Sequence, residues 1–459
     1  MPLKNGSLIL VVGFGLKTGV SIARFALTRG VRVRAVDSKP AEKLADSMRA
    51  TGNAVELVSG GMPLSALDGV SLVVLSPGVP RNGELLTEAD RRGIPVIGDI
   101  ELAFRYARCR MAGITGTDGK STTTAMVGSI LETASLGRVA GNIGIPVLDV
   151  VDGMAPGSIL ALELSSFMLE SIERFKPEVA AILNLAEDHL DRYPDMESYL
   201  AAKLRIFSNL DAGCTAVWPT DNPWSGRFAG AIPAGVRRVS FALDDAAADV
   251  HLGTTGEGVE ILMIAGEPCL PAGDLPVMGR HNLRNAVSAA AIAFALGISR
   301  QAIADGLRAF RGLPHRFENA GTAAGVRFIN DSKATTISAV ATALDSAGAG
   351  SCILIGGRDK GLEFSPLREA ILRKNLVVFP FGEAREKVRA QLGCERAGDP
   401  SLEVVVREAW EYARRNRAAE IILAPGCTSY DEFPNFEIRG EFFKDLVKRL
   451  RLEVGDGET

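Results

Sequence analysis

The sequence predicts an α/β fold with three domains, each built on a mostly parallel β-sheet. Short apolar runs at residues 7–12, 70–75 and 159–162 are typical of buried strands, and they alternate with stretches of helical periodicity. This alternation indicates parallel sheets covered by helices. A chain of 459 residues also fits roughly three domains. We expect their boundaries at residues 1–98, 99–312 and 313–459.

A glycine-rich turn at residues 113–121 (GITGTDGKS) is the feature around which the middle domain is organised. Gly116 and Gly119 allow backbone N–H groups to face one concavity at a helix start, and such a nest binds phosphate. Lys120 would reach the outer phosphates, and the Ser121 hydroxyl would ligate magnesium. The first glycine stands one position early for the G-x-x-x-x-G-K-[ST] pattern. The prediction is a central, P-loop ATPase-like domain that binds a nucleoside triphosphate; the alternative is a plain Gly/Thr-rich turn.

Residues 7–37 predict a Rossmann-like first domain. The strand at 7–12 leads into a glycine turn, a helix at 20–28 and a second strand at 31–36 that ends at Asp37. The spacing G-x-G-x-x-x-G is one residue longer than the dinucleotide fingerprint, so another nucleotide fits at least as well as NAD. Ser76 follows the strand at 70–75, where ligands of open α/β sheets bind, although a Pro-Gly turn alone explains that stretch too.

Composition excludes several classes of protein. The net charge of −4 gives no electrostatic reason to expect nucleic acid or an anionic membrane as a partner. The six cysteines are scattered without a C-x-x-C pair, which fits a reducing cytoplasm. No apolar run approaches the length of a membrane span. We therefore expect a cytoplasmic protein, and we expect it to be monomeric.

Polar side chains follow the predicted strands of the second and third domains. Glu163 follows the strand at 159–162, and His189 lies shortly after a strand at 179–183. The stretch at residues 279–285 is expected to begin an alanine-rich helix that runs to about residue 296. The third, Rossmann-like α/β domain has expected strands at 327–329, 352–355, 376–379 and 420–423.

Motifs along the whole chain resemble those of the Mur ligase family. They lie at residues 115–121, 141–144, 163–167, 187–193, 202–205, 279–282, 315–318, 330–335 and 429–440. The stretches at 331–335 and 429–440 are similar to those of members that add D-glutamate. Three positions depart from the family pattern: Asp118 and Thr336 stand where Asn is usual, and Met168 stands where Gln is common. Asp118 adds a negative charge beside the expected phosphates.

The resemblance implies an ATP-dependent ligase of cytoplasmic peptidoglycan precursor synthesis. It would add D-glutamate to UDP-N-acetylmuramoyl-L-alanine through an acyl phosphate. The implied cofactors are ATP and Mg²⁺ at two sites, one of them bridged by a carbamylated Lys203. The implied catalytic residues are Lys120, Glu163, His189 and Lys203, and the implied metal ligands are Ser121, Glu163, His189 and Lys203.

The resemblance also implies three sets of binding residues. The ATP set is Gly116, Thr117, Asp118, Gly119, Lys120, Ser121, Thr122, Asn282, Asn285, Arg316 and Asp331. The set for the UDP-linked substrate is Gly15, Leu16, Lys17, Thr18, Asp37, Ser38, Ser76, Asn142 and His189. The D-glutamate set is Lys333, Thr335, Lys360, Ser429 and Phe436.

Each of these residues also has an ordinary structural explanation. Lys203 in isolation would be a solvated helical lysine, and Asn282 a helix N-cap. His189 alone would be a partly buried histidine, and Lys360 a charge in a turn. Rival functions are another Mur-type or folylpolyglutamate-type amide ligase, an NAD-dependent oxidoreductase, and a non-catalytic sensor of the nucleotide precursor. The metal-site residues speak against a sensor, because sensing would not require them.

Overall fold

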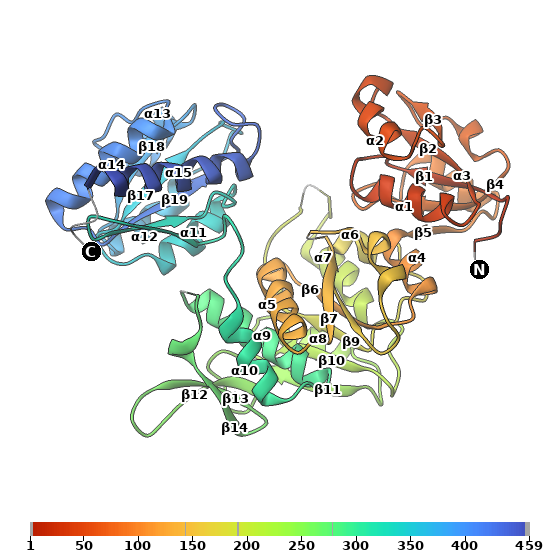
Figure 1. The fold of residues 1–459 in the computed structure, drawn as a ribbon, viewed down its shortest axis with the longest axis horizontal. Helices are drawn as coiled ribbons and strands as arrows, with labels where there is room; N and C mark the ends of the chain where they lie inside the picture. Colours follow the sequence, from red (N-terminus) through yellow and green to blue (C-terminus); the bar gives the residue numbers. More distant parts are fainter. Residues whose placement is uncertain (1–2, 143, 191, 278, 455–459) are drawn as a thin grey trace. The chain divides into compact units, whose positions relative to one another are not determined.

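A computed structural model describes residues 3–142, 144–190, 192–277 and 279–454. Ile143 and Asp191, which belong to two of the motifs above, lie outside the described residues. The chain forms two compact units, one of residues 1–276 with 282–310 and the other of residues 277–281 with 311–459. Figure 1 shows the elements of both units, which are described separately below.

The first sheet has the order β3-β2-β1-β4-β5, and all of its neighbouring strands are parallel. Its strands are β1 (Leu8–Val12), β2 (Arg32–Asp37), β3 (Glu56–Ser59), β4 (Val70–Leu75) and β5 (Val96–Gly98). Its helices are α1 (Thr18–Leu27), α2 (Ala45–Ala50) and α3 (Glu84–Arg91). The order reverses between β1 and β4, and ligands of such sheets bind beyond the strand ends at this point.

The second sheet, in the same unit, has nine strands in the order β14-β13-β12-β11-β10-β9-β6-β8-β7. They are β6 (Arg110–Thr115), β7 (Gly137–Gly141), β8 (Ile159–Glu163), β9 (Val179–Ile182), β10 (Thr215–Pro219), β11 (Arg237–Phe241), β12 (Val250–Thr254), β13 (Glu260–Ile264) and β14 (Glu267–Pro271). The strands from β7 to β12 pair in parallel, whereas β12, β13 and β14 pair in an antiparallel manner. This antiparallel extension was not predicted from the sequence.

The helices that accompany the second sheet carry several of the polar residues described below. They are α4 (Asp99–Tyr106), α5 (Lys120–Thr133), α6 (Ser166–Leu169), α7 (Met196–Leu204), α8 (Ser225–Ala231), α9 (Arg280–Ala295) and α10 (Arg300–Ala309). Glu101 of α4 is fully buried and accepts hydrogen bonds from the backbone N–H groups of residues 173–175, at 2.8–2.9 Å. This contact fixes the segment that leads into β9.

The second unit contains the third sheet, with the order β15-β16-β19-β17-β18. Its strands are β15 (Glu318–Ala323), β16 (Val326–Asn330), β17 (Cys352–Gly356), β18 (Val377–Phe381) and β19 (Glu420–Gly426). Only β15, at the edge, is antiparallel to its neighbour among these described strands. The helices are α11 (Ile337–Ser346), α12 (Arg368–Arg373), α13 (Arg385–Leu392), α14 (Leu402–Asn416) and α15 (Phe436–Val454).

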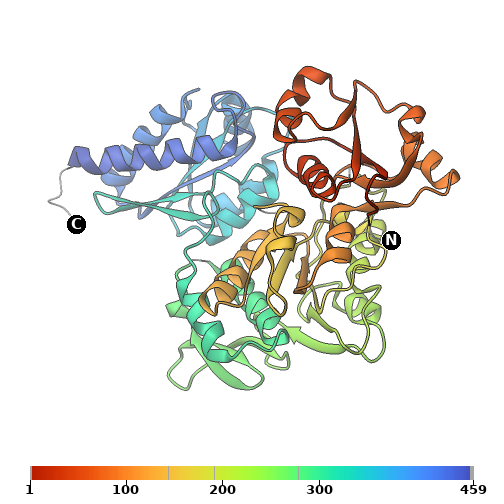
Figure 2. The same ribbon diagram turned by 45° about the vertical axis from the view of Figure 1, so that its right-hand side comes forward.

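Two apolar layers cover the third sheet. Helices α14 and α15 pack on one face through residues that include Trp410 and Phe443, and α11 to α13 pack on the other through residues that include Leu344 and Val388. Figures 1 and 2 both show the long α15 lying along this sheet. Because β16, β19 and β17 are parallel, the loops that follow them emerge at the same edge of the sheet.

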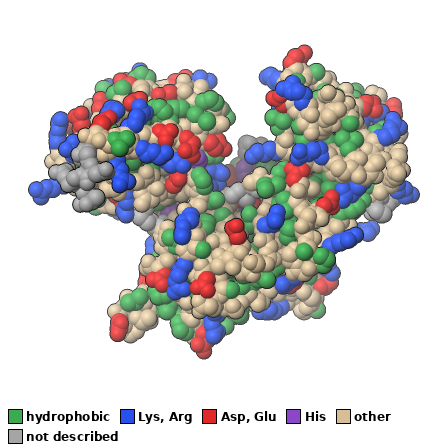
Figure 3. Space-filling model, in the orientation of Figure 1, with side chains coloured by type: hydrophobic (Ala, Val, Ile, Leu, Met, Phe, Trp, Pro, Cys, Tyr) green, Lys and Arg blue, Asp and Glu red, His purple; other side chains and the backbone are tan. Residues whose placement is uncertain are grey.

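The predicted α/β fold class, with parallel sheets in three regions, is confirmed. The two boundaries between the predicted domains stay predictions; the first of them falls between β5 and α4. No helix among the described residues is long and apolar enough to cross a bilayer. On the face shown in Figure 3, Lys and Arg side chains are interspersed with Asp and Glu.

Candidate functional site

The glycine turn of the second sheet connects β6 to α5, as the sequence predicts. Gly119 is the residue before α5 and has a left-handed backbone with φ 75°. A Cβ at Gly119 would collide with the Asn285 Oδ1, and one at Gly116 would lie 3.0 Å from the Leu183 Cβ. Both positions therefore require glycine. The first N–H groups of any α-helix have no acceptor within the helix, so the start of α5 is suited to bind phosphate.

Asn184 holds this loop in shape, although the sequence analysis gave it no role. Its Oδ1 accepts hydrogen bonds from the backbone N–H groups of Thr117 (2.9 Å) and Asp118 (2.8 Å). Its Nδ2 donates to the Asp118 carbonyl oxygen at 3.0 Å. The only sequence signal is its position two residues after β9, the strand next to β6 in the sheet.

Two lysines converge on the carbonyl oxygen of Gly116. The Lys120 Nζ donates to it at 2.9 Å and to the Thr117 carbonyl oxygen at 2.6 Å. The Lys203 Nζ, from α7, donates to the same Gly116 oxygen at 2.6 Å. Lys203 is only 1% exposed and also lies 4.5 Å from the centre of the Tyr199 ring. The structure therefore does not support the reading of Lys203 as a solvated lysine.

The charges around Gly116 perturb one another. Burial, together with the positive charge of Lys120, holds the pKa of Lys203 well below its usual value, while Asp188 and Asp118 act in the opposite direction. Desolvation of the Asp118 carboxyl raises its pKa, and the positive charge of Lys120 opposes that rise. Asp118 is nevertheless an exposed residue of the loop. Its carboxylate therefore lies within electrostatic reach of both lysines.

Glu163 is a buried carboxylate at the carboxyl end of β8. It is 1% exposed, and its Oε1 accepts a hydrogen bond from the Asn142 Nδ2 at 2.8 Å. Its Oε2 has no hydrogen-bond partner. An orphan carboxylate oxygen is costly to bury, and a hard cation would satisfy it. Ser121 lies in the first turn of α5 and is also buried. These oxygen donors fit magnesium.

The described residues hold no group of three or more His, Cys, Asp or Glu side chains that could bind a metal ion on its own. Magnesium sites commonly combine one or two carboxylates with phosphate oxygens and water. The arrangement of Glu163 and Ser121 is consistent with such a shared site.

His189 adopts a strained conformation beside the glycine turn at residues 113–121, which is called the phosphate loop below. Its φ of 55° is uncommon for a residue other than glycine. The backbone N–H donates to the Asp188 Oδ1 at 2.8 Å. The ring lies 5.0 Å from the Phe167 ring and 5.9 Å from the Tyr199 ring, and it remains partly exposed. A partly exposed, strained histidine of this kind is a candidate functional group.

A cavity of about 590 Å³ opens beyond the carboxyl ends of β1 and β4. Of the residues predicted to bind the UDP-linked substrate, it is lined by Gly15, Lys17, Thr18, Asp37, Ser38, Ser76 and Asn142. Leu16 is exposed in the same turn, and neither Leu16 nor His189 lines the cavity.

Two of the cavity residues also stabilise the cavity wall. The Asp37 carboxylate accepts hydrogen bonds from the N–H groups of Phe14 (2.8 Å) and Lys39 (2.9 Å). The Ser76 hydroxyl donates to the Gly13 carbonyl oxygen at 2.6 Å. These two side chains therefore hold the backbone of the cavity wall in place, in addition to any contact that they make with a ligand.

Asn282 and Asn285 are both buried at the start of α9. The Asn285 Nδ2 donates to the Asn282 Oδ1 at 3.3 Å, and the Thr123 hydroxyl donates to the Asn285 Oδ1 at 3.4 Å. Asn285 thus packs against the phosphate loop and α5. The neighbouring Thr122 lies half-buried in the first turn of α5. The expected contacts of these residues with ATP stay predictions.

The five residues predicted to bind D-glutamate lie at one edge of the third sheet. Lys333 and Thr335 follow β16, Lys360 follows β17, Ser429 follows β19, and Phe436 begins α15. The Lys333 Nζ lies 5.3 Å from the centre of the Phe436 ring. Ser429 is buried, whereas Lys360 is exposed.

Arg316 and Asp331 are neighbours in the second unit. The Asp331 Oδ1 accepts a hydrogen bond from the Phe317 N–H at 3.2 Å. Desolvation raises the pKa of Asp331 to about 6, and the Phe317 N–H and Arg316 oppose that rise. His315 and Phe317, on either side of Arg316, both have positive φ values. The turn that presents Arg316 is therefore held in a strained shape.

Comparison with known proteins identifies close relatives along the whole length. A protein named UDP-N-acetylmuramoylalanine--D-glutamate ligase from Acidobacterium capsulatum is 38% identical, and the alignment covers 97% of each chain. A protein of the same name from Pelotomaculum thermopropionicum is 37% identical, over 96% of this chain and 98% of that one.

Family models and solved structures agree with these relatives. The Mur ligase middle domain matches residues 114–293, and the Mur ligase MurD-like N-terminal domain matches residues 7–98. The crystal structure of UDP-N-acetylmuramate-alanine ligase MurC from Thermotoga maritima is 19% identical, with a TM-score of 0.57 over 96% of this chain and 99% of that one. A MurF structure from Acinetobacter baumannii is 17% identical, with a TM-score of 0.61 over 96% and 93%. These structures share the fold.

Replacing Asn184 with Ala should loosen the phosphate loop and weaken ATP binding. The backbone N–H groups of Thr117 and Asp118 would lose their acceptor, and loss of such hydrogen bonds costs about 1–3 kcal/mol, or roughly ten- to a hundredfold in affinity. Titration with a fluorescent ATP analogue measures the effect.

Asn209→Ala is the matched control for this change. The Asn209 Nδ2 also donates to backbone carbonyl oxygens, those of Glu173 and Phe175, but away from the loop. Its removal should change nucleotide affinity by less than about twofold. Equal affinities of the Asn184→Ala and wild-type proteins would contradict the role assigned to Asn184.

Proposed function

Because the chain belongs to the Mur ligase family, we propose that it is an ATP-dependent ligase that adds D-glutamate to UDP-N-acetylmuramoyl-L-alanine. The observation that carries the proposal is the end-to-end similarity to proteins of that name, at 38% identity over 97% of the chain. The phosphate loop, the cavity of the first sheet and the polar edge of the third sheet are three sites that such a reaction can use.

The chemistry requires an activated carboxyl group. A carboxylate is a poor electrophile, so its oxygen first takes the γ-phosphoryl group of ATP, and ADP leaves. The amine of D-glutamate then attacks the carbonyl carbon of the acyl phosphate, an amide bond forms, and inorganic phosphate leaves with the loss of an amine proton. Transfer between anions depends on alignment and on neutralisation of charge. The helix N-terminus and Lys120 supply both at the phosphate loop.

Magnesium would be held by the oxygen donors of the central sheet. Glu163 and Ser121 are proposed for the first site, and His189 with a modified Lys203 for the second. The ions would neutralise charge on the phosphate oxygens. The orphan Glu163 Oε2 supports the first assignment. For the second, the support is the closeness of Lys203 to the loop, through its hydrogen bond to Gly116.

Lys203 is proposed to carry a carbamate. An ammonium group would repel a magnesium ion, whereas a carbamate is an anion with oxygen donors. It forms when the neutral amine attacks CO₂ and a proton is released. The lowered pKa of Lys203, caused first by burial and then by Lys120, increases the fraction of neutral amine near pH 7. Burial and charge thus favour the modification.

The cavity of the first sheet is proposed to bind the uridine diphosphate part of the substrate. Gly15, Lys17 and Thr18 lie in the turn before and at the start of α1, where backbone N–H groups and a cation suit a diphosphate. Asn142 lines this cavity and also donates to Glu163. It therefore connects the proposed substrate cavity with the proposed metal site.

The edge of the third sheet is proposed to bind D-glutamate. Lys360 would pair with one carboxylate, and the Ser429 hydroxyl with a backbone N–H near Phe436 would receive the other. A dicarboxylate needs donors at two separated points, and loops from different strands supply them. We place the reaction in the cytoplasm and expect a monomer; the six free cysteines fit a reducing compartment.

An assay of phosphate release tests the proposed function. Turnover should require ATP, magnesium, UDP-N-acetylmuramoyl-L-alanine and D-glutamate together. The matched alternatives are L-glutamate, L-lysine and meso-diaminopimelate with the same precursor. Equal turnover with any of these amino acids would refute the D-glutamate assignment.

Replacing Lys203 with Ala should abolish most turnover while the protein remains folded. The change removes the proposed metal-bridging carbamate, and loss of such electrostatic stabilisation typically costs roughly a hundredfold or more in rate. Added short carboxylates should restore part of the rate, because they can stand in for the carbamate.

Lys176→Ala is the control for the Lys203 change. Lys176 is exposed and pairs with Asp211 at 2.6 Å, so its loss should alter turnover by less than about twofold. Normal turnover of Lys203→Ala at limiting magnesium would rule out the metal-bridging role.

Replacing Lys360 with Ala should raise the KM for D-glutamate by roughly ten- to a hundredfold, because a charge-assisted contact contributes about 1.5–3 kcal/mol. The KM values for ATP and the nucleotide precursor should move little, since other loops bind them. Lys448→Ala removes an exposed lysine of α15 that pairs with Asp445, and it should leave all three constants unchanged. An unchanged KM for D-glutamate in Lys360→Ala would place the amino-acid site elsewhere.

A further inference from the structure

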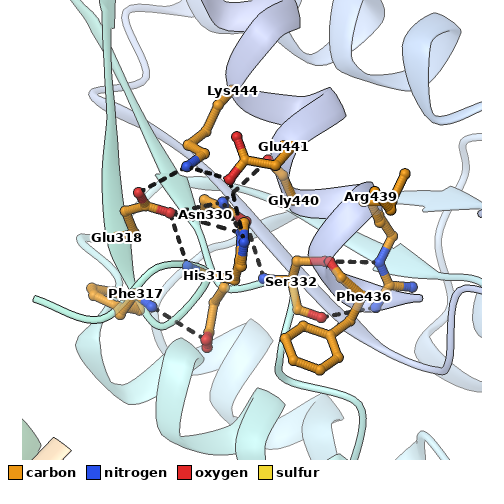
Figure 4. Close-up of polar contacts among 12 residues, drawn as sticks. His315, Phe317, Glu318, Asn330, Ser332, Phe436, Arg439, Gly440, Glu441 and Lys444 are labelled. Carbon is orange, nitrogen blue, oxygen red and sulfur yellow. Dashed lines mark hydrogen bonds and ion pairs between the residues drawn. The ribbon is translucent and has the colours of Figure 1, made fainter. Parts of the chain in front are cut away.

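Arg439 of α15 is buried where loops of the third sheet meet. Its side chain has 0% exposure. The Nε donates to the Ser332 Oγ at 3.0 Å, and the Nη2 donates to the carbonyl oxygens of Ser332 (2.8 Å) and Cys427 (3.1 Å). Figure 4 shows the guanidinium facing Ser332 from the helix. One side chain thus binds backbone atoms of two separate loops.

These loops carry residues proposed to bind the amino acid. Ser332 immediately precedes Lys333, and Cys427 lies two positions before Ser429. The Ser332 hydroxyl that accepts from Arg439 donates in turn to the Phe436 carbonyl oxygen at 2.8 Å. The loop after β16, the loop after β19 and the start of α15 are therefore joined through one guanidinium.

The loop after β17 packs against the same guanidinium. Gly357 is its first residue, and a Cβ placed there would lie 3.1 Å from the Arg439 Nη1. The φ of Gly357 is +124°, which also favours glycine. The next residue, Arg358, donates its N–H to the Thr428 carbonyl oxygen at 2.9 Å. Lys360 follows in this loop, so Arg439 lies behind all three loops.

Arg439 also places a fixed positive charge at this edge of the sheet. Burial lowers its pKa to about 10, while Asp431 raises it, so the group is cationic at neutral pH. Among the described residues no carboxylate forms an ion pair with this guanidinium, and its buried Nη1 has no hydrogen-bond partner. A buried cation of this kind is costly unless something else requires it.

We propose that Arg439 is a positioning residue of the amino-acid site, which holds the three loops in register and favours an anionic amino acid by its charge. The proposal rests on the proposed function, because it takes D-glutamate as the ligand. Arg439 itself is inaccessible, so it acts through the loops and not by contact with the substrate. The guanidinium is suited to this task because its planar donors reach several carbonyl oxygens at once.

The test compares Arg439→Met and Arg439→Lys with the wild-type enzyme in steady-state assays of all three substrates. Arg439→Met should raise the KM for D-glutamate by roughly tenfold or more, because small misplacement of binding groups has effects of this size. Arg439→Lys keeps the charge but cannot span two loops, so its KM should be raised to an intermediate value. The KM values for ATP and the nucleotide precursor should stay within about twofold of wild type.

Lys374→Met is the matched control in the same unit. The Lys374 Nζ donates to the carbonyl oxygens of Leu344, Asp345 and Ala347, but it lies just before β18, at the opposite end of the strands. The KM for D-glutamate should not change in this variant. If Arg439 had a merely structural role, Arg439→Met would shift all three substrate constants together, and that result would overturn the proposal.

Ser332→Ala provides a second test that does not remove the buried charge. It deletes the hydroxyl between Arg439 and the Phe436 carbonyl oxygen, and it should raise the KM for D-glutamate severalfold. A folded Ser332→Ala protein with unchanged KM, like an Arg439→Met protein with unchanged KM, would overturn the proposal.

The wild-type enzyme in the same assay separates this inference from the proposed function. If it used a different amino acid, the D-glutamate assignment would fail. The same comparison of variants would then be made with that amino acid, and a selective rise in its KM would still support the positioning role.

Discussion

The carbonyl oxygen of Gly116 accepts hydrogen bonds from two lysines, and the chemistry of the central site depends on this contact. Lys120 belongs to α5 and Lys203 to α7, so the shared oxygen ties two helices to the phosphate loop. Two cations on one acceptor repel each other, and the buried one is more easily deprotonated. Burial and Lys120 together lower the pKa of Lys203, so its amine loses a proton more easily than that of a solvated lysine.

The sequence was sufficient for residues whose role follows from local pattern. The strand at 70–75, the phosphate loop and the turns after β16, β17 and β19 could be located because strands and turns have local signals. The roles expected for Lys333, Lys360 and Ser429 in those turns came from the family resemblance. The antiparallel strands β12 to β14 were missed. They are only five residues long, and β13 buries only the alternate residues Leu262 and Ile264, although all of residues 261–264 are apolar.

Residues whose role depends on distant contacts could not be predicted in this way. Asn184 is one polar residue among several after β9, and only the folded loop shows that it binds the N–H groups of Thr117 and Asp118. Arg439 lies in a helix with charged neighbours, where arginine is normally exposed. Its burial follows from the meeting of three loops, which no local pattern encodes. Family resemblance supplied Lys203, since its helix alone predicts a solvated lysine.

In each of the three sheets, a side chain satisfies backbone polar groups of the loops beyond the strand ends. Loops beyond strand ends carry backbone polar groups that must be satisfied even when no ligand is bound. Asp37 binds N–H groups in the first sheet, Asn184 does so in the second, and Arg439 binds carbonyl oxygens in the third. Because these inner side chains fix the loops, the outer residues need not hold the backbone. Lys17, Lys360 and the start of α5 can therefore present charge or N–H groups to a ligand without first having to order the loops that carry them.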